Sequence, residues 1–246
     1  MTKHFELLES NRKHIVTYSD VKIPAKELVE EALYKAWKTQ PSKNNMMAYH
    51  VDVYGPDRKI TKQYIWKLCN QNHIRTDKEY NEKGFSNVTL NAKSHPNPNY
   101  NHIRSSAYLF VFYPRLVTKA NPFYTESIKR GEHVADEMIP NQITKLREHI
   151  SVEVGIFAAN LTNYLLSSNI DISYNVCFNR DIKRWQDYGF TWMNYAPVLM
   201  MSAGIAEVTR KEWLENTDDG WKQSYPDVKP ELEEVICWKN NKALEN

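Results

Sequence analysis

Apolar residues recur at helical spacing in the stretch VKIPAKELVEEALYKAWKTQPS, which begins at Val21. The recurring positions lie three or four residues apart and define one face: Leu28, Ala32, Leu33, Ala36 and Trp37. Pro24 suits the first helical position, and Pro41 prevents the helix from continuing. The pattern therefore predicts an amphipathic helix of about four turns.

Other stretches have the patterns of strands. In AYHVDVYGP, apolar and polar residues alternate until Gly55 and Pro56 end the pattern. SSAYLFVFYP, which ends at Pro114, is short and continuously apolar, so it predicts a buried central strand. DISYNVCF and APVLMMSAGIAEV predict two further strands, and PELEEVICW, within about 230–240, predicts an extended segment able to cross to a partner subunit.

The strongest helix signal runs over about 142–168. Apolar residues step by three or four along one side and alanines occupy the other: Ile150, Val154, Phe157, Leu161, Tyr164 and Leu165, with Ala158 and Ala159 opposite. We expect a helix buried on most sides. Residues 61–68 predict a shorter helix, whereas 70–100 are polar and broken by prolines, which predicts an irregular excursion.

Composition narrows the class of protein. The chain has 246 residues, of which 41% are apolar and 12% aromatic, so it suits a globular fold with a core and not a disordered or fibrous chain. It contains no repeat and no low-complexity linker, and we expect one domain over 1–246. The net charge of +2 comes from charges spread along the chain, so no nucleic-acid-binding arm is predicted.

Cysteine spacing and hydropathy bear on where the protein works. Cys69, Cys177 and Cys237 lie far apart and form no C-x-x-C pair, so we predict neither a disulfide framework nor a zinc ribbon. The N-terminal stretch MTKHFELLESNRKH lacks the apolar region of a signal peptide, and no stretch reaches the ~18 apolar residues of a membrane helix. We expect a cytoplasmic protein without a membrane partner.

Three segments resemble motifs of the FMN-dependent nitroreductase family. RKHIVTY at 12–18 resembles the family's R-R-S-x-R-x-F, and PSKNNMMAYHV at 41–51 resembles P-S-x-x-N-x-Q-P-W-x-F. SSNIDISYNVCF at 167–178 stands in the place of A-L-G-L-x-x-x-P-I-x-G-F. The resemblance implies an α+β fold of three layers, α-β-α, around a mostly antiparallel sheet, in a domain-intertwined homodimer whose two FMN sites are built by both subunits.

On this resemblance, the FMN phosphate is held near the start of the chain. Arg12 would hold the phosphate and Lys13 would assist, while His14 would donate to a phosphate or ribityl oxygen. Lys229, just before Pro230, is the best match for a further phosphate-binding cation. The alternative for the first three residues is a solvated basic turn before a strand.

The resemblance places the flavin ring against two other segments. Pro41, Ser42 and Asn45 form the corner whose polar groups would contact the ring edge and ribityl chain, and the backbone N–H groups around Val176 and Cys177 would approach the flavin N5. Pro-Ser-x-Asn is also an ordinary helix stop and turn. Cys177 alone is more typical of a packing residue than of a reactive thiol.

The activity implied is that of an NAD(P)H-dependent FMN oxidoreductase working by a ping-pong cycle. Nicotinamide reduces the flavin and leaves, and a small acceptor such as a nitroaromatic or a quinone enters the same slot. No catalytic side chain is implied, because the flavin carries the redox chemistry. The histidines are scattered, with no H-x-x-x-H on a helix, so no metal site is predicted.

Several departures from the motifs keep other functions open. Val16 stands where the family has a second cation, Met47 replaces the Gln, and Asn169 and Cys177 replace glycines. They motivate a second hypothesis, a relative that keeps the fold but binds flavin weakly or not at all and acts in binding or assembly. A third, a nucleic-acid accessory protein, predicts salt-dependent retention on DNA or RNA that we do not expect.

Overall fold

The computed structural model describes residues 14–42, 47–70, 101–114, 126, 129–131, 147–209, 211–212 and 235. Its elements are, in order, β1 (Ile15–Tyr18), α2 (Lys26–Thr39), β2 (Tyr49–Tyr54), α3 (Lys59–Asn70), α5 (Asn101–Ser105), β3 (Tyr108–Pro114), α9 (Arg147–Ser167), β4 (Asp171–Asn175), α10 (Ile182–Asp187), β5 (Leu199–Gly204) and β6 (Ala206–Thr209). Beyond Asn70, the predicted excursion lies outside the described residues. In the predicted extended segment at 230–240, Val235 alone is described, and it is helical.

A four-stranded antiparallel sheet in the order β2-β3-β5-β4 forms the middle of the molecule. β3 lies between two other strands and all of its residues are buried, which confirms the central strand predicted for SSAYLFVFYP. The stretch APVLMMSAGIAEV, predicted as one strand, forms two. The chain leaves the sheet at Ile205, and β6 pairs with β1 in a separate two-stranded sheet.

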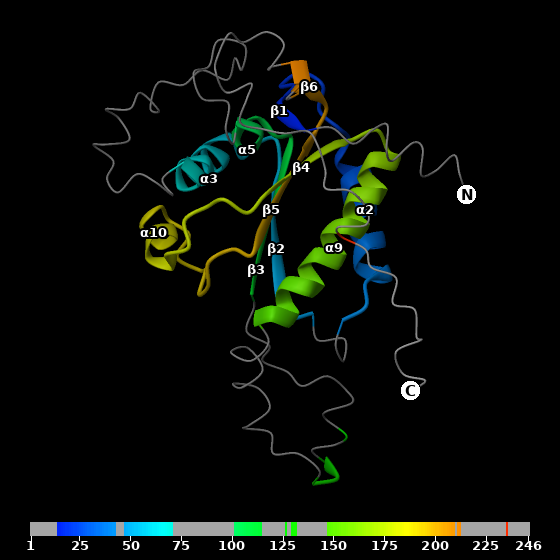
Figure 1. The fold of residues 1–246 in the computed structure, drawn as a ribbon, viewed down its shortest axis with the longest axis vertical. Coiled ribbons are helices and arrows are strands. Elements are labelled where there is room, and N and C mark those ends of the chain that lie inside the picture. The colour runs from blue at the N-terminus through cyan, green and yellow to red at the C-terminus, as the bar shows by residue number, and fades with distance from the viewer. Residues whose placement is uncertain are drawn as a thin grey trace, which may run out of the picture.

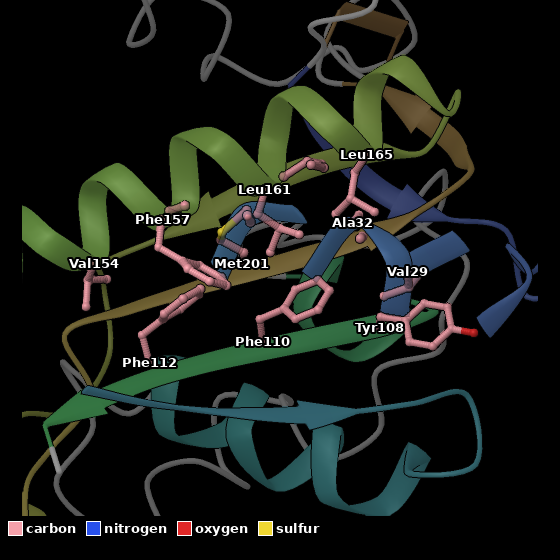
Figure 2. Packing of buried hydrophobic residues seen from close by; sticks show 14 of the residues in the cluster. Val29, Ala32, Tyr108, Phe110, Phe112, Val154, Phe157, Leu161, Leu165 and Met201 are labelled. Atoms are coloured by element: carbon pink, nitrogen blue, oxygen red, sulfur yellow. The ribbon is translucent and has the colours of Figure 1, made fainter. Parts of the chain in front are cut away.

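Helices cover both faces of the four-stranded sheet (Figure 1). α2 and α9 pack on one face, while α3, α5 and α10 lie on the other. Successive residues of β3 point to opposite faces, so Phe110 and Phe112 pack under α9 (Figure 2), and Leu109 and Val111 join the second core. This arrangement confirms the three-layer α-β-α fold with an antiparallel sheet.

α2 presents only part of its predicted face to the core, because Ala32, Leu33 and Ala36 pack there whereas the other two predicted residues are exposed. Ala25 caps the helix, so Pro24 precedes the helix and does not occupy its first position. The buried side chains are small or branched: Val29, Ala32 and Ala36. Leu28 is 42% exposed and Trp37 is 51% exposed. Apolar residues occur on two adjacent faces of α2, and contact with α9 selects the face with the smaller side chains, which lets the two helices approach closely.

α9 confirms the strongest helix prediction over 147–167, and residues 142–146 lie outside the described part. Its inward face packs on the sheet through residues spaced by three or four (Figure 2): Ile150, Val154, Phe157, Leu161 and Leu165. Burial on most sides is wrong for a single chain, because Val152 is 61% exposed and Gly155 and Ala159 are exposed too. Neither α9 nor any other described helix has the length and apolar content needed to cross a membrane.

The turn after α9 accounts for one departure from the nitroreductase motif. Asn169 has a φ of 57°, and the N–H of the following Ile170 donates to Leu165 O at 3.0 Å. A left-handed residue directly after a helix is usually glycine, and asparagine is among the few other residues that tolerate this conformation. Asn169 therefore preserves the turn between α9 and β4.

Candidate functional site

A cavity of about 690 Å³ opens between the first half of α9, the loop that follows β4 and the segment that leads into β5. Its walls are mostly apolar and include Val154 of α9, Val176 after β4 and Val198 before β5. Arg180 is the one charged side chain among the described residues that line it. A cavity of this size with apolar walls and few polar groups is typical of a small-molecule site.

Arg180 joins two walls of this cavity. Its Nη2 donates to Val176 O at 3.1 Å, and its Nη1 donates to Pro197 O at 3.2 Å. The guanidinium carbon lies 4.4 Å from the centre of the Phe178 ring, which is fully buried. The guanidinium plane is therefore held in place by two hydrogen bonds and a ring contact.

The Asn175 side chain holds the loop after β4 in place through hydrogen bonds. Its Oδ1 accepts from Cys177 N at 2.8 Å, and its Nδ2 donates to Cys177 O at 3.3 Å and to Cys69 Sγ at 3.2 Å. Cys69 is buried, and burial raises the pKa of its thiol. The Cys177 N–H, predicted to point at a flavin N5, is therefore already hydrogen-bonded within the chain, whereas Val176 borders the cavity and is 55% exposed.

Ser42 fastens the corner after α2 to α9. Its Oγ donates to Glu153 Oε2 at 2.9 Å and accepts from Met47 N at 2.9 Å. Gln40 adds a second link, because its Nε2 donates to Glu153 O at 2.8 Å. Pro41 is exposed beside these groups. The corner thus serves as the helix stop and turn that its sequence also suggests, next to the α9 residues that line the cavity.

His14 is exposed directly before β1. His102 of α5 is 6% exposed, and its Nδ1 shares a hydrogen bond of 2.8 Å with Ser202 Oγ. Burial, and secondarily the charge of His14, lower the pKa of the His102 imidazole to about 3. Tyr18 completes the cluster, since its hydroxyl donates to Ser202 O at 2.8 Å.

His102 and Ser42 lie on opposite sides of the four-stranded sheet. Ser202 stands between two residues of β5 that pack under α2 and α9, so its side chain faces the α5 layer with His102. Ser42 instead bonds to Glu153 on α9. The prediction that the segments near residues 12 and 43 hold one ligand stays a prediction, since Arg12, Lys13 and Asn45 lie outside the described residues.

Four predicted site residues lie outside the described part of the chain: Arg12, Lys13, Asn45 and Lys229. Val16 is 3% exposed within β1, so the position where the family motif has a cation belongs to the core here. Sequence reasoning missed Arg180 and Asn175. Their closeness in sequence to the third motif could have pointed to them, because both residues lie within three positions of Phe178 at the end of that motif.

Three solved structures share this fold over almost the whole chain. A protein described as a nitroreductase from Bacillus subtilis has a TM-score of 0.63 and 11% identity, covering 97% of this chain and 100% of its own. One described as a nitroreductase in complex with FMN, from Exiguobacterium sibiricum, has a TM-score of 0.60 and 16% identity. The match covers 96% of this chain and 97% of its own. One described as an NAD(P)H:FMN oxidoreductase, from Staphylococcus epidermidis, has a TM-score of 0.57 and 15% identity. The match covers 96% of this chain and 95% of its own. No protein-family model and no curated protein matches the sequence.

Proposed function

We propose that this chain, which has a nitroreductase-like fold, is an FMN-dependent oxidoreductase that transfers hydride from NAD(P)H to a small acceptor such as a nitroaromatic or a quinone. The observation that carries the proposal is the cavity of about 690 Å³ beside Val176, in a fold that one similar structure shares while holding FMN. Its volume and its apolar walls suit a flat isoalloxazine ring. Nicotinamide and acceptor would occupy the space over the ring in turn.

Residues from two subunits would hold the cofactor. The proposed site combines the basic stretch of one subunit with the Pro-Ser corner of the other, as the resemblance to the nitroreductase family implies for a homodimer. The phosphate would be held by basic residues, and the ring edge and ribityl chain by the corner: Arg12, Lys13, His14 and Lys229, then Pro41, Ser42 and Asn45. Bound FMN would supply the hydride chemistry at its N5.

One contact favours a second candidate function. The Cys177 N–H donates to Asn175 Oδ1, so it is not available to a flavin N5 unless the loop rearranges. Val16 also leaves the motif without its second cation. A flavin-free protein of the same fold, acting in binding or assembly, agrees with both observations.

The absorption spectrum of the purified protein separates the two candidates. A flavin oxidoreductase shows the absorbance of bound oxidised flavin, which bleaches when NADPH or NADH is added without oxygen. A colourless protein that also fails to take up added FMN would leave the binding or assembly function in place. Bleaching by NADPH and not by NADH, or the reverse, would identify the reductant.

Arg12→Ala tests the phosphate site directly. Loss of a charge-assisted contact to the phosphate is expected to weaken FMN retention by about tenfold or more, because hydrogen bonds between charged groups contribute roughly 1.5–3 kcal/mol. Arg58→Ala is the matched control, since Arg58 is exposed and pairs with Asp57 at 3.2 Å. Equal FMN affinity of both variants and the unmodified protein would remove Arg12 from the site.

A further inference from the structure

The cavity beside Val176 combines an apolar wall with one fixed positive charge. Val154, Val198 and Leu199 line it from the first half of α9 and from the start of β5. Arg180 is the sole charged side chain of its described lining. An apolar body inside such a cavity is removed from water, and the position of the charge then selects the polar end of the ligand.

The charge of Arg180 is not neutralised by the described part of the protein. Its two hydrogen-bond partners, Val176 O and Pro197 O, are neutral carbonyls, and it makes no ion pair with a described carboxylate. A guanidinium has five N–H donors, so donors remain after these two bonds. Arg180 is exposed, so an anion from solvent reaches these remaining donors.

The guanidinium is also fixed before any ligand arrives. The bonds to two carbonyls and the contact with Phe178 restrict its rotation, so little side-chain entropy is lost on binding. A planar fork matches the two oxygens of a carboxylate. A phosphate dianion would leave one of its charges without a partner at this single cation.

We propose that Arg180 anchors the carboxylate of a small apolar acid whose body lies in the cavity between α9, the loop after β4 and the start of β5, in the space over the proposed flavin ring. This deepens the proposed function and rests on it in one respect, since it makes a carboxylate-bearing apolar compound the acceptor class of the oxidoreductase. Binding of the acid itself requires the cavity and Arg180 alone.

The test compares a flat aromatic acid with its neutral analogue. 2-Naphthoate and 2-naphthamide are titrated into the full-length protein as purified, by calorimetry. The unmodified protein is expected to bind the acid about tenfold or more tightly than the amide, because a charge-assisted pair contributes roughly 1.5–3 kcal/mol. Arg180→Met is expected to abolish this preference, and Arg180→Lys to keep part of it, since the ammonium retains charge without the fork.

Two further variants test whether the preference for the acid depends on Arg180 itself and whether binding depends on the cavity. Lys183→Met removes an exposed positive charge from α10, outside the cavity, and is expected to keep the full preference for the acid. Gly155→Leu places a side chain into the cavity from α9 while leaving Arg180 intact, and is expected to lose both ligands. Retained naphthoate binding by Gly155→Leu, or an equal loss of preference in Lys183→Met, overturns the assignment.

Other outcomes distinguish this site from the proposed function. Equal binding of acid and amide by the unmodified protein, or no binding of either, overturns the carboxylate site even if the protein carries flavin. A flavin-free protein that binds naphthoate through Arg180 supports the site and contradicts the oxidoreductase. If Arg180→Met weakens NADPH binding and leaves the naphthoate preference intact, Arg180 serves the nicotinamide cofactor and the carboxylate site is wrong.

Discussion

His102 is a residue whose ionisation is controlled by burial. It lies against Ser202 in the interior, and its pKa is lowered to about 3, whereas a histidine in an unfolded chain takes up a proton below about 6.5. Between these two values the unfolded state binds more protons than the folded state. The contribution of His102 to stability is therefore complete above about pH 6.5 and is lost as the pH falls toward 3.

His102→Asn is expected to flatten the pH dependence of stability. Asparagine is able to keep a hydrogen bond to Ser202 but does not titrate. Between about pH 6.5 and 4.5, the free energy of unfolding of the unmodified protein should fall by up to roughly 1.4 kcal/mol per pH unit more than that of the variant. Urea unfolding at several pH values measures this. His50→Asn, at an exposed position, should show the same pH dependence of stability as the unmodified protein. If the free energy of unfolding has the same pH dependence in all three proteins, His102 is not the group responsible.

At the scale of elements, two glycines have opposite surroundings. Gly155 lies within α9, and a Cβ added there meets no atom within 4 Å. Gly204 ends β5, and a Cβ there would lie 2.8 Å from a ring carbon of Tyr18. Tyr18 is 1% exposed and bonded to Ser202, so its ring has little room to move away.

Alanine at the two positions is expected to change stability in opposite directions. Gly155→Ala should stabilise the protein by about 0.5–1 kcal/mol, because alanine has the higher helix propensity. Gly204→Ala should destabilise it by roughly 1–3 kcal/mol through overpacking against Tyr18. Denaturant unfolding of both variants measures the two signs. A destabilised Gly155→Ala would indicate that the partner in the proposed homodimer packs against Gly155 too closely for a methyl group.

The sequence of α2 predicts a helix but does not predict which of its faces is buried. Its helical spacing is visible in the sequence, but its apolar residues lie on two adjacent faces. Leu28 and Trp37 belong to the exposed face, and Val29 to the buried one. The packing partner α9 decides between them, and the residues that form α9 follow more than a hundred positions later.

For the whole molecule, the packing of a single chain does not explain why the outer face of α9 carries small and apolar residues. Val152 is 61% exposed, and Gly155 and Ala159 are exposed on the same helix. Small and apolar side chains on an exposed helix are typical of a surface that packs against another helix. The proposed homodimer would cover this face and would bring the Pro-Ser corner of one subunit toward the basic stretch of the other.

Val152→Glu is expected to shift the protein from dimer to monomer. A charge placed in a packed apolar interface loses its hydration without gaining a partner, so association should weaken by at least about tenfold. Sedimentation over a range of protein concentrations measures this, and FMN retention should fall together with the dimer. Ile60→Glu is the matched control, because Ile60 is 74% exposed on α3 in the opposite layer. A monomeric unmodified protein would rule out the shared site.

Local patterns in the sequence sufficed to predict the type of most described elements. β2, β3 and α9 were predictable because alternation, a short apolar run and three-to-four spacing are local consequences of strand and helix geometry. The order of the motifs also sufficed to predict the nitroreductase-like fold at 11–16% identity to the similar structures. Such a fold tolerates sequence change wherever backbone geometry is kept, as Asn169 shows at the turn after α9.

Which of these residues come into contact depends on how the whole chain folds. The break at Ile205, the separation of His102 from Ser42 by the sheet, and the cavity lined by Arg180 all depend on segments distant in sequence. Periodicity carries no information about such contacts, because it reports which face of an element is apolar and not which element covers it. The engagement of the Cys177 N–H by Asn175 is likewise a property of a folded loop, since backbone hydrogen bonds depend on conformation and not on residue type.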